Sequence, residues 1–136
     1  MNVARTLDFF ETQMDKASQD LGKYLINPDV EVLHQIRVDL KKIRAVIIQI
    51  EKSTGNKKIK KTHRYIKHIF RKGGQIRELQ LDLLWLKKHR KFNLIRHMKF
   101  DARLKKSGMA FHKEIPVMLH TLGVVRKKME RFNHGL

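Results

Sequence analysis

Basic side chains recur at helical spacing in three separate segments of this sequence. Residues three or four apart on an α-helix lie about 5–6 Å apart on one face, and each like-charge pair there costs ~0.2–0.5 kcal/mol. A bound polyanion would turn this repulsion into attraction, because each cation would meet a phosphate and release counterions from the ligand. The three rows therefore predict a surface that binds a polyanion. They are His34, Arg37, Lys41 and Arg44; Lys60, Arg64, Lys67 and Arg71; and Arg96, Lys99, Arg103 and Lys106.

The charge of the whole chain agrees with this interpretation. Among 136 residues, 31 are Lys or Arg and 13 are Asp or Glu, which gives a net charge of +18 at pH 7. Residues 1–31 carry three basic and six acidic residues, so the net charge of +21 on the remainder exceeds that of the whole chain. Residues 52–77 contain ten Lys or Arg and no acid. Self-repulsion on this scale opposes compaction, yet a hydrophobic content of 41% is too high for a disordered basic tail. We expect a folded basic domain with a polyanionic partner.

Catalytic and metal-binding patterns are missing from the sequence. The chain has no Cys, which excludes a disulfide framework, a thiolate zinc site and a Cys nucleophile. Its eight His form neither a His-Glu-x-x-His motif nor a pair four residues apart. Hydrolysis of a phosphate polymer would require carboxylates that hold a divalent metal, and no Asp-x-Asp pair or Walker loop occurs. We expect a protein that is not an enzyme and uses no cofactor and no metal.

The type of polyanion is narrowed by what the basic rows lack. Helices that read DNA aim Asn, Gln or Arg at base edges, and single-strand binders add aromatic stacking platforms. Aromatic residues make up only 7% of this chain, and Phe70, Phe100 and Phe111 lie at spacings typical of packing. A polyanion without bases is therefore favoured over a nucleic acid as the ligand. Non-specific RNA or DNA binding by the same surface is the alternative, and an adaptor for an acidic protein is a third hypothesis.

Apolar periodicity predicts that the chain is all-α, a single domain over residues 1–136. Residues 1–31 would form an acidic scaffold helix, and residues 32–136 would supply the basic ligand-binding helices. Short connections favour antiparallel neighbours, so the expected fold is an antiparallel helical bundle of about five helices. The expected helices cover residues 2–24, 30–52, 57–72 with a continuation to 91, 93–113 and 116–132.

Chain-breaking and capping residues set these boundaries. Pro28 should end the first helix, because the residue before a proline avoids the α region, and Asp29 should cap the second. Residues 53–56 read as a turn. We expect Gly73-Gly74 to kink or break the third helix, and Pro116 to open the last one.

Neither a membrane span nor an export signal is evident. The longest apolar stretch, residues 45–50, is six residues long and contains Gln49, whereas a transmembrane helix needs about 20 apolar residues. The N-terminal segment lacks the apolar core of a signal peptide and carries Asp8, Glu11 and Asp15. We expect a cytoplasmic protein.

Residues 32–44, which read VLHQIRVDLKKIR, resemble the signature of the CHAD family, the conserved histidine α-helical domain. In that family a helix reads His-x-x-Arg-Val-x-x-Lys/Arg-Lys/Arg-Leu-Arg. Residues 74–81, GQIRELQL, resemble a second family segment, Gly-x-x-Arg-Asp-x-Asp-Val, although Glu78 and Gln80 stand where the family has acidic Asp residues. The resemblance covers residues 30–90. It implies a helical bundle that binds inorganic polyphosphate along a basic groove or pore, in some members at polyphosphate granules.

The resemblance also assigns residues. It places His34, Arg37, Lys41, Lys42 and Arg44 against phosphate, and it matches Arg77 to a family arginine that could bind phosphate or support the fold. His34 has two open interpretations, a phosphate donor or a packed surface ring. Periodicity alone adds Lys60, Arg64, Lys67, Arg71, Lys99 and Arg103 to the phosphate-binding set.

The length of the chain suggests that two copies assemble into one binding unit. A typical family domain is about twice as long and has two similar halves that face one another across the basic channel. This chain contains one copy of the His-x-x-Arg helix. We therefore hypothesise a homodimer, in which a two-fold axis replaces the internal symmetry. A monomer with an open groove is the alternative.

Overall fold

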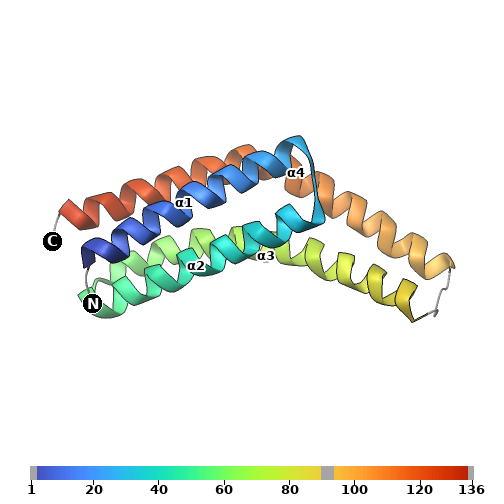
Figure 1. Ribbon diagram of the computed structural model, residues 1–136, viewed down its shortest axis with the longest axis horizontal. Helices are drawn as coiled ribbons and strands as arrows, with labels where there is room; N and C mark the ends of the chain where they lie inside the picture. Colours follow the sequence, from blue (N-terminus) through green and yellow to red (C-terminus); the bar gives the residue numbers. More distant parts are fainter. Residues whose placement is uncertain (1–2, 90–93, 135–136) are drawn as a thin grey trace.

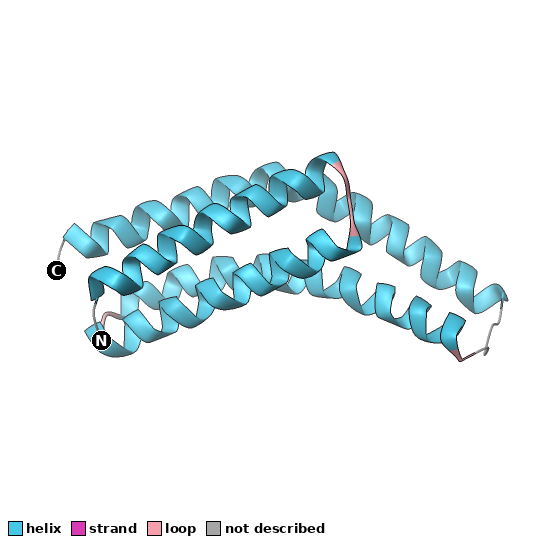
Figure 2. Cartoon of the chain, viewed as in Figure 1, coloured by secondary structure: helices cyan, strands magenta, loops and turns pink. Residues whose placement is uncertain are grey.

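The computed structural model describes residues 3–89 and 94–134, and these form four α-helices and no strand (Figures 1 and 2). The helices are α1 (Val3–Ile26), α2 (Val30–Thr54), α3 (Lys57–Lys88) and α4 (Leu94–His134). The all-α prediction is confirmed, with four helices where about five were expected. No helix in the described part of the chain is both long enough and apolar enough to cross a bilayer.

The four helices form an antiparallel bundle. Each helix packs on its neighbours in a ring, α1 on α2, α2 on α3, α3 on α4 and α4 on α1, and the described residues give no contact across either diagonal. In Figure 1, α1 and the second half of α4 form one layer, α2 and the first half of α3 form the other, and both chain ends lie at one end of the bundle. Apolar residues at three- and four-residue steps fill the core, including Phe10, Leu40, Ile47, Ile66 and Ile115.

The boundaries of α2 follow from local signals. Asp29 is its N-cap, where the Asp29 Oδ1 atom accepts a hydrogen bond of 2.9 Å from the Glu31 backbone N–H. Gly55 ends the helix in the left-handed region with φ 66°, a conformation that costs glycine little. Asn56 then caps α3 by accepting from the Lys58 N–H at 3.0 Å. These positions confirm the expected cap at residue 29. The expected turn at 53–56 is shorter than predicted, because α2 continues to Thr54 and only residues 55–56 lie between the two helices.

The glycine pair does not break the third helix. α3 runs without interruption through Gly73 and Gly74, so the expectation of a separate segment after residue 72 is wrong. A mid-helix glycine costs only about 1 kcal/mol relative to alanine. Packing offsets part of this cost at Gly74, because a Cβ atom there would lie only 3.2 Å from the Arg37 Nη2 atom of α2, whereas a Cβ atom on Gly73 would make ordinary contact with the Arg37 Cγ atom at 3.5 Å.

Pro116 does not open a new helix either. α4 is one helix of 41 residues with Pro116 inside it, so the expected division between residues 113 and 116 is wrong. A proline removes one backbone donor and bends a helix, but the buried Ile115 and Met118 pack on either side of it and keep both halves in the core. The expected helix ends at 91 and 93 lie outside the described residues.

Two helices are longer than the bundle. α3 and α4 continue past the α1–α2 loop and leave the four-helix part at an angle (Figure 1). We call residues 77–88 of α3 and 94–109 of α4 the arm. Leu83 and Leu86 are buried within the arm but do not belong to the bundle core.

Candidate functional site

The neighbouring helices α2 and α3 bring two of the basic rows together. The Arg37 guanidinium carbon lies 4.4 Å from the centroid of the Phe70 ring of α3, and the Lys41 Nζ atom lies 5.9 Å from the same centroid. One to two turns further along, Arg44 of α2 lies near His63 of α3. The charges of Arg44 and of Lys67 both lower the pKa of His63. We call this line the basic seam. Its members are Arg37, Lys41, Arg44, Lys60, His63, Lys67 and Phe70.

The pKa of His63 is sensitive to the positive charges of the basic seam. Burial lowers the pKa of His63 below its ordinary value, and the positive charges of Arg44 and Lys67, and to a lesser degree Lys60, lower it further, while Glu51 opposes them. The Nε2 atom of His63 is buried and has no hydrogen-bond partner among the described residues. The ring is therefore disposed to be neutral while the seam is empty, and an anion placed beside it would favour the charged form.

The seam cations have no carboxylate within ion-pair distance in the described residues, although Glu51 of α2 lies near enough to His63 to affect its pKa. Within residues 3–89 and 94–134, none of the Lys and Arg members of the seam forms an ion pair, whereas basic residues elsewhere do. Lys72 of α3 donates to Glu114 of α4 at 2.6 Å, and Arg126 of α4 pairs with Glu11 of α1 at 2.7 Å. The acids of α1 thus neutralise part of α4, and the face formed by α2 and α3 keeps its positive charge.

Arg37 is held in place by the packing of the two helices. Its guanidinium stacks on Phe70, and a Cβ atom on Gly74 would lie only 3.2 Å from the Arg37 Nη2 atom. The Nε atom of Arg37 is buried without a hydrogen-bond partner in the described structure. A guanidinium fixed in this way loses little conformational freedom when its outer nitrogens bind an oxyanion.

Other residues of the predicted set border the seam. His34 is exposed at the start of α2, in the same row as Arg37 and Lys41, and Arg77 is partly buried on α3 in the row of Phe70 and Gly74. Arg71 is exposed one turn beyond Lys67. These side chains can extend a charged track along the α2–α3 face.

Two predicted residues turn away from the seam. Lys42 lies on the α1 side of α2, where it lines a hollow with Arg5 and Phe9. One residue along a helix is a rotation of about 100°, which separates Lys42 from Lys41. Arg64 lines a hollow between α3 and α4 with Tyr65 and Glu114.

The third basic row does not join the other two. Lys99 and Arg103 lie in the arm with Arg96 and Phe100, around a hollow of about 170 Å³. α2 and α4 are not neighbours in the ring of described helices, and this row lies in the arm, beyond the start of α2. The structure therefore brings together the rows of α2 and α3 and leaves that of α4 apart.

Sequence reasoning missed His63 and Phe70 as members of the seam. Both belong to the row of α3 that includes Lys67 and Gly74, at three- and four-residue steps. A search for Lys and Arg alone passes over them, whereas the complete row at helical spacing would have found them.

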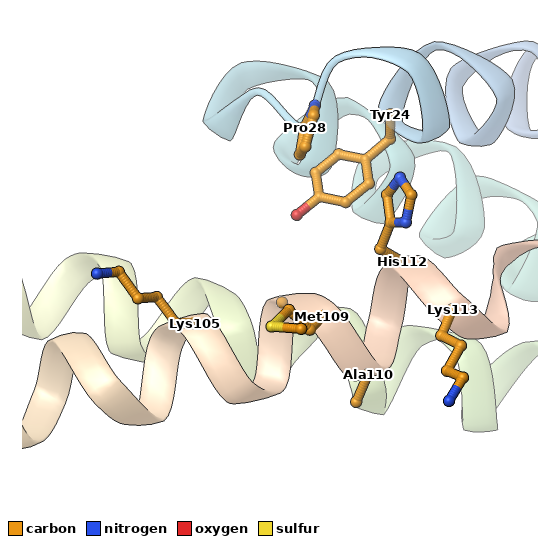
Figure 3. Close-up of a pocket in the computed structure, with 8 residues that line it drawn as sticks. Tyr24, Pro28, Lys105, Met109, Ala110, His112 and Lys113 are labelled. Carbon is orange, nitrogen blue, oxygen red and sulfur yellow. The ribbon is translucent and has the colours of Figure 1, made fainter.

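A separate recess lies at the elbow where the arm meets the α1–α2 loop. It measures about 960 Å³ and is lined mainly by apolar groups, with the Tyr24 ring pointing in between Pro28 and Met109, and with Lys105 and Lys113 nearby (Figure 3). His112 fixes this corner by donating from Nε2 to the Leu25 carbonyl oxygen at 2.7 Å.

No family model, curated protein or solved structure matches this chain. In the described residues no group of three or more His, Asp or Glu side chains could hold a metal ion.

Proposed function

We propose that this protein binds inorganic polyphosphate without catalysis, along the basic seam between α2 and α3. The observation that carries the proposal is the meeting of cations from two helices around Phe70 and His63, with no carboxylate paired to them in the described structure. A linear polyanion placed on the seam would supply the missing negative charge along its whole length. Its many identical phosphates suit a row that repeats with each helical turn.

The aromatic residues favour a ligand without bases. Phe70 is covered by Arg37 and Lys41, and Tyr65 lies beneath the Lys128 Nζ atom at 5.0 Å. The basic seam thus offers no open ring on which a base could stack, which is how single-strand binders gain much of their affinity.

The proposal includes a cellular setting and an assembly. We place the protein in the cytoplasm, associated with polyphosphate granules where these occur. A homodimer would present two seams to one long polymer, which raises avidity without any new contact.

Competition tests the choice of ligand. Labelled polyphosphate should be displaced by unlabelled polyphosphate at a lower phosphate concentration than by single-stranded RNA or by duplex DNA, measured by fluorescence anisotropy at one ionic strength. Equal or better displacement by nucleic acid would replace the proposal with non-specific nucleic-acid binding.

Adjacent lysines provide a matched pair of variants. Lys41 and Lys42 are both exposed on α2 and change the net charge equally when replaced by Glu, but only Lys41 belongs to the seam. We expect Lys41→Glu to weaken polyphosphate binding about 10- to 100-fold, since a hydrogen bond to a charged group contributes ~1.5–3 kcal/mol. Lys42→Glu should weaken it only a few-fold. Equal losses in the two variants would mean that net charge, not the seam, binds the polymer.

A further inference from the structure

The row of α3 that faces α2 continues into the arm with apolar residues. In the bundle this row contains Phe70 and Gly74, which contact Arg37. At three- and four-residue steps it passes through Arg77 to Leu81 and Leu84. α2 begins only at Val30, so no helix covers these leucines, which are 47% and 56% exposed.

The row of α4 that faces α1 shows the same change. Arg126 and His112 bind α1, at Glu11 and at the Leu25 carbonyl. Seven-residue steps from His112 lead through Lys105 to Met98, which lies beyond the end of α1 and is 61% exposed. Met109, at the elbow recess, is also largely exposed (Figure 3). The arm is thus half of a four-helix bundle, with the two sides that α1 and α2 cover elsewhere left open.

The open surface is large enough for a stable contact. Seven big apolar side chains of the arm are between 47% and 74% exposed. Together with the aliphatic stems of the neighbouring lysines, they offer an area on the order of the 800 Å² per partner that standard interfaces bury. Monomeric proteins rarely expose apolar patches of this size. The seven are Leu81, Leu84, Trp85, Leu94, Ile95, Met98 and Met109.

The charge of α3 also changes where the arm begins. Residues 57–72 carry eight basic residues and no acid, whereas residues 77–88 carry three basic and two acidic residues, Glu78 and Asp82. The arm part of α3 is therefore nearly neutral and apolar, a composition that suits contact with another protein surface better than contact with a polyanion.

We infer that the arm is the interface at which two copies of this chain dimerise. The uncovered sides require an antiparallel pair of helices, and the arm is itself such a pair, of matching length. Two arms related by a two-fold axis would each supply the helices that the other lacks and form a second four-helix layer. This inference does not depend on polyphosphate binding, because the arm surface and the basic seam share no residue.

The oligomeric state in the absence of polyphosphate tests the inference. Sedimentation equilibrium should give twice the chain mass at micromolar concentration and moderate salt. Leu84→Glu and Met98→Glu should give monomers, with helicity by circular dichroism unchanged. Val117→Glu is the matched control, since Val117 is 64% exposed on the bundle half of α4, and it should remain dimeric. A parent protein that is monomeric at all concentrations and salts would overturn the inference, as would a dimer that persists in both arm variants.

Two site-specific probes give independent readouts. Trp85 is the only tryptophan and is 48% exposed in the arm, so its emission should shift to the blue as concentration rises and return on dilution. Because the chain has no Cys, Met98→Cys can be crosslinked with a short bismaleimide, and a covalent dimer is expected. Val117→Cys should give monomer under the same conditions. Crosslinking at residue 117 and not at residue 98 would assign the contact to the bundle and reject the arm.

Discussion

The most informative side chains of the basic seam are those whose chemistry is altered by their neighbours. Arg37 is fixed by an aromatic ring and by two glycines, and His63 is surrounded by cations. A fixed guanidinium and a histidine with a lowered pKa give the seam a directional anion contact and a proton-linked one. Each can be tested by a single substitution.

His63 should make polyphosphate binding depend on pH. Burial and the cations Arg44, Lys67 and Lys60 hold the pKa of His63 below 6.5 in the free protein, and a bound polyanion would raise it. Binding should therefore take up a proton, and affinity should increase as pH falls through the pKa of the complex. Calorimetry in buffers of different ionisation enthalpy measures this uptake. His63→Gln should remove this proton uptake. If the uptake is lost in His34→Ala but not in His63→Gln, the titrating group is His34.

Asp39 should be a site where neutralisation stabilises the fold. Its side chain is fully buried, with Oδ1 accepting from the Gln35 Nε2 atom at 2.9 Å, and burial together with the nearby Asp20 carboxyl raises its pKa from 3.8 to about 6. An acid with a raised pKa costs stability above that pKa, and the cost disappears as pH falls toward the unfolded value.

Asp39→Asn should therefore raise the free energy of unfolding by roughly 1–3 kcal/mol at pH 8. The gain should be small at pH 4, as measured by urea unfolding. Asp82→Asn, at an exposed carboxyl in the arm, is the control and should change stability little at either pH. A destabilised Asp39→Asn protein at pH 8 would show that the charged form of Asp39 supports the fold.

At the scale of helices, Gly74 of α3 leaves room for the Arg37 side chain of α2. Gly74→Ala should stabilise α3 by about 0.5–1 kcal/mol, because the φ of Gly74 is ordinary for a helix. The new Cβ atom, however, would lie 3.2 Å from the Arg37 Nη2 atom and would push the guanidinium aside. We expect a higher Tm together with a several-fold loss of polyphosphate affinity. Gly123→Ala meets nothing within 4 Å and should raise Tm without changing affinity. Unchanged affinity in Gly74→Ala would show that the position of Arg37 does not matter for binding.

Sequence alone predicted the limits of the helices better than it predicted which helix packs against which. Asp29, Gly55 and Asn56 act on the backbone beside them, so the limits of α2 could be read locally. Pro116 was misread because its effect depends on what packs against it, and for the same reason the sequence could not decide whether the glycine pair breaks α3 or only bends it. Lys41 and Lys42 could not be separated either, since only the bundle shows which side of α2 meets α1 and which meets α3.

At the scale of the whole molecule, charge is distributed by face. α1 carries acids that pair with α4. The cations of α2 and of the first half of α3 have no such partners in the described structure, except for Lys72, which pairs with Glu114 of α4. The net charge of +18 therefore acts mainly as repulsion within one layer of the bundle.

Stability should consequently respond to any anion that screens or binds this layer. We expect Tm, followed by circular dichroism, to rise between low and moderate salt because screening weakens the repulsion. Polyphosphate at about 100 times its Kd should add roughly 2.7 kcal/mol to the free energy of unfolding. In Lys41→Glu the salt effect should shrink slightly and the polyphosphate effect should fall sharply. A Tm independent of both additions would contradict this account of the charged face.

The placement of the two chain ends has a mechanical consequence. α1 begins and α4 ends side by side at the end of the bundle away from the arm (Figure 1). Force applied between the termini would therefore unzip α1 from α4 one turn at a time, and would not shear the whole interface at once. The ion pairs of Arg126 with Glu11 and Asp15 would be among the first contacts to carry the load, while the seam on the opposite layer would stay intact until late in the pull.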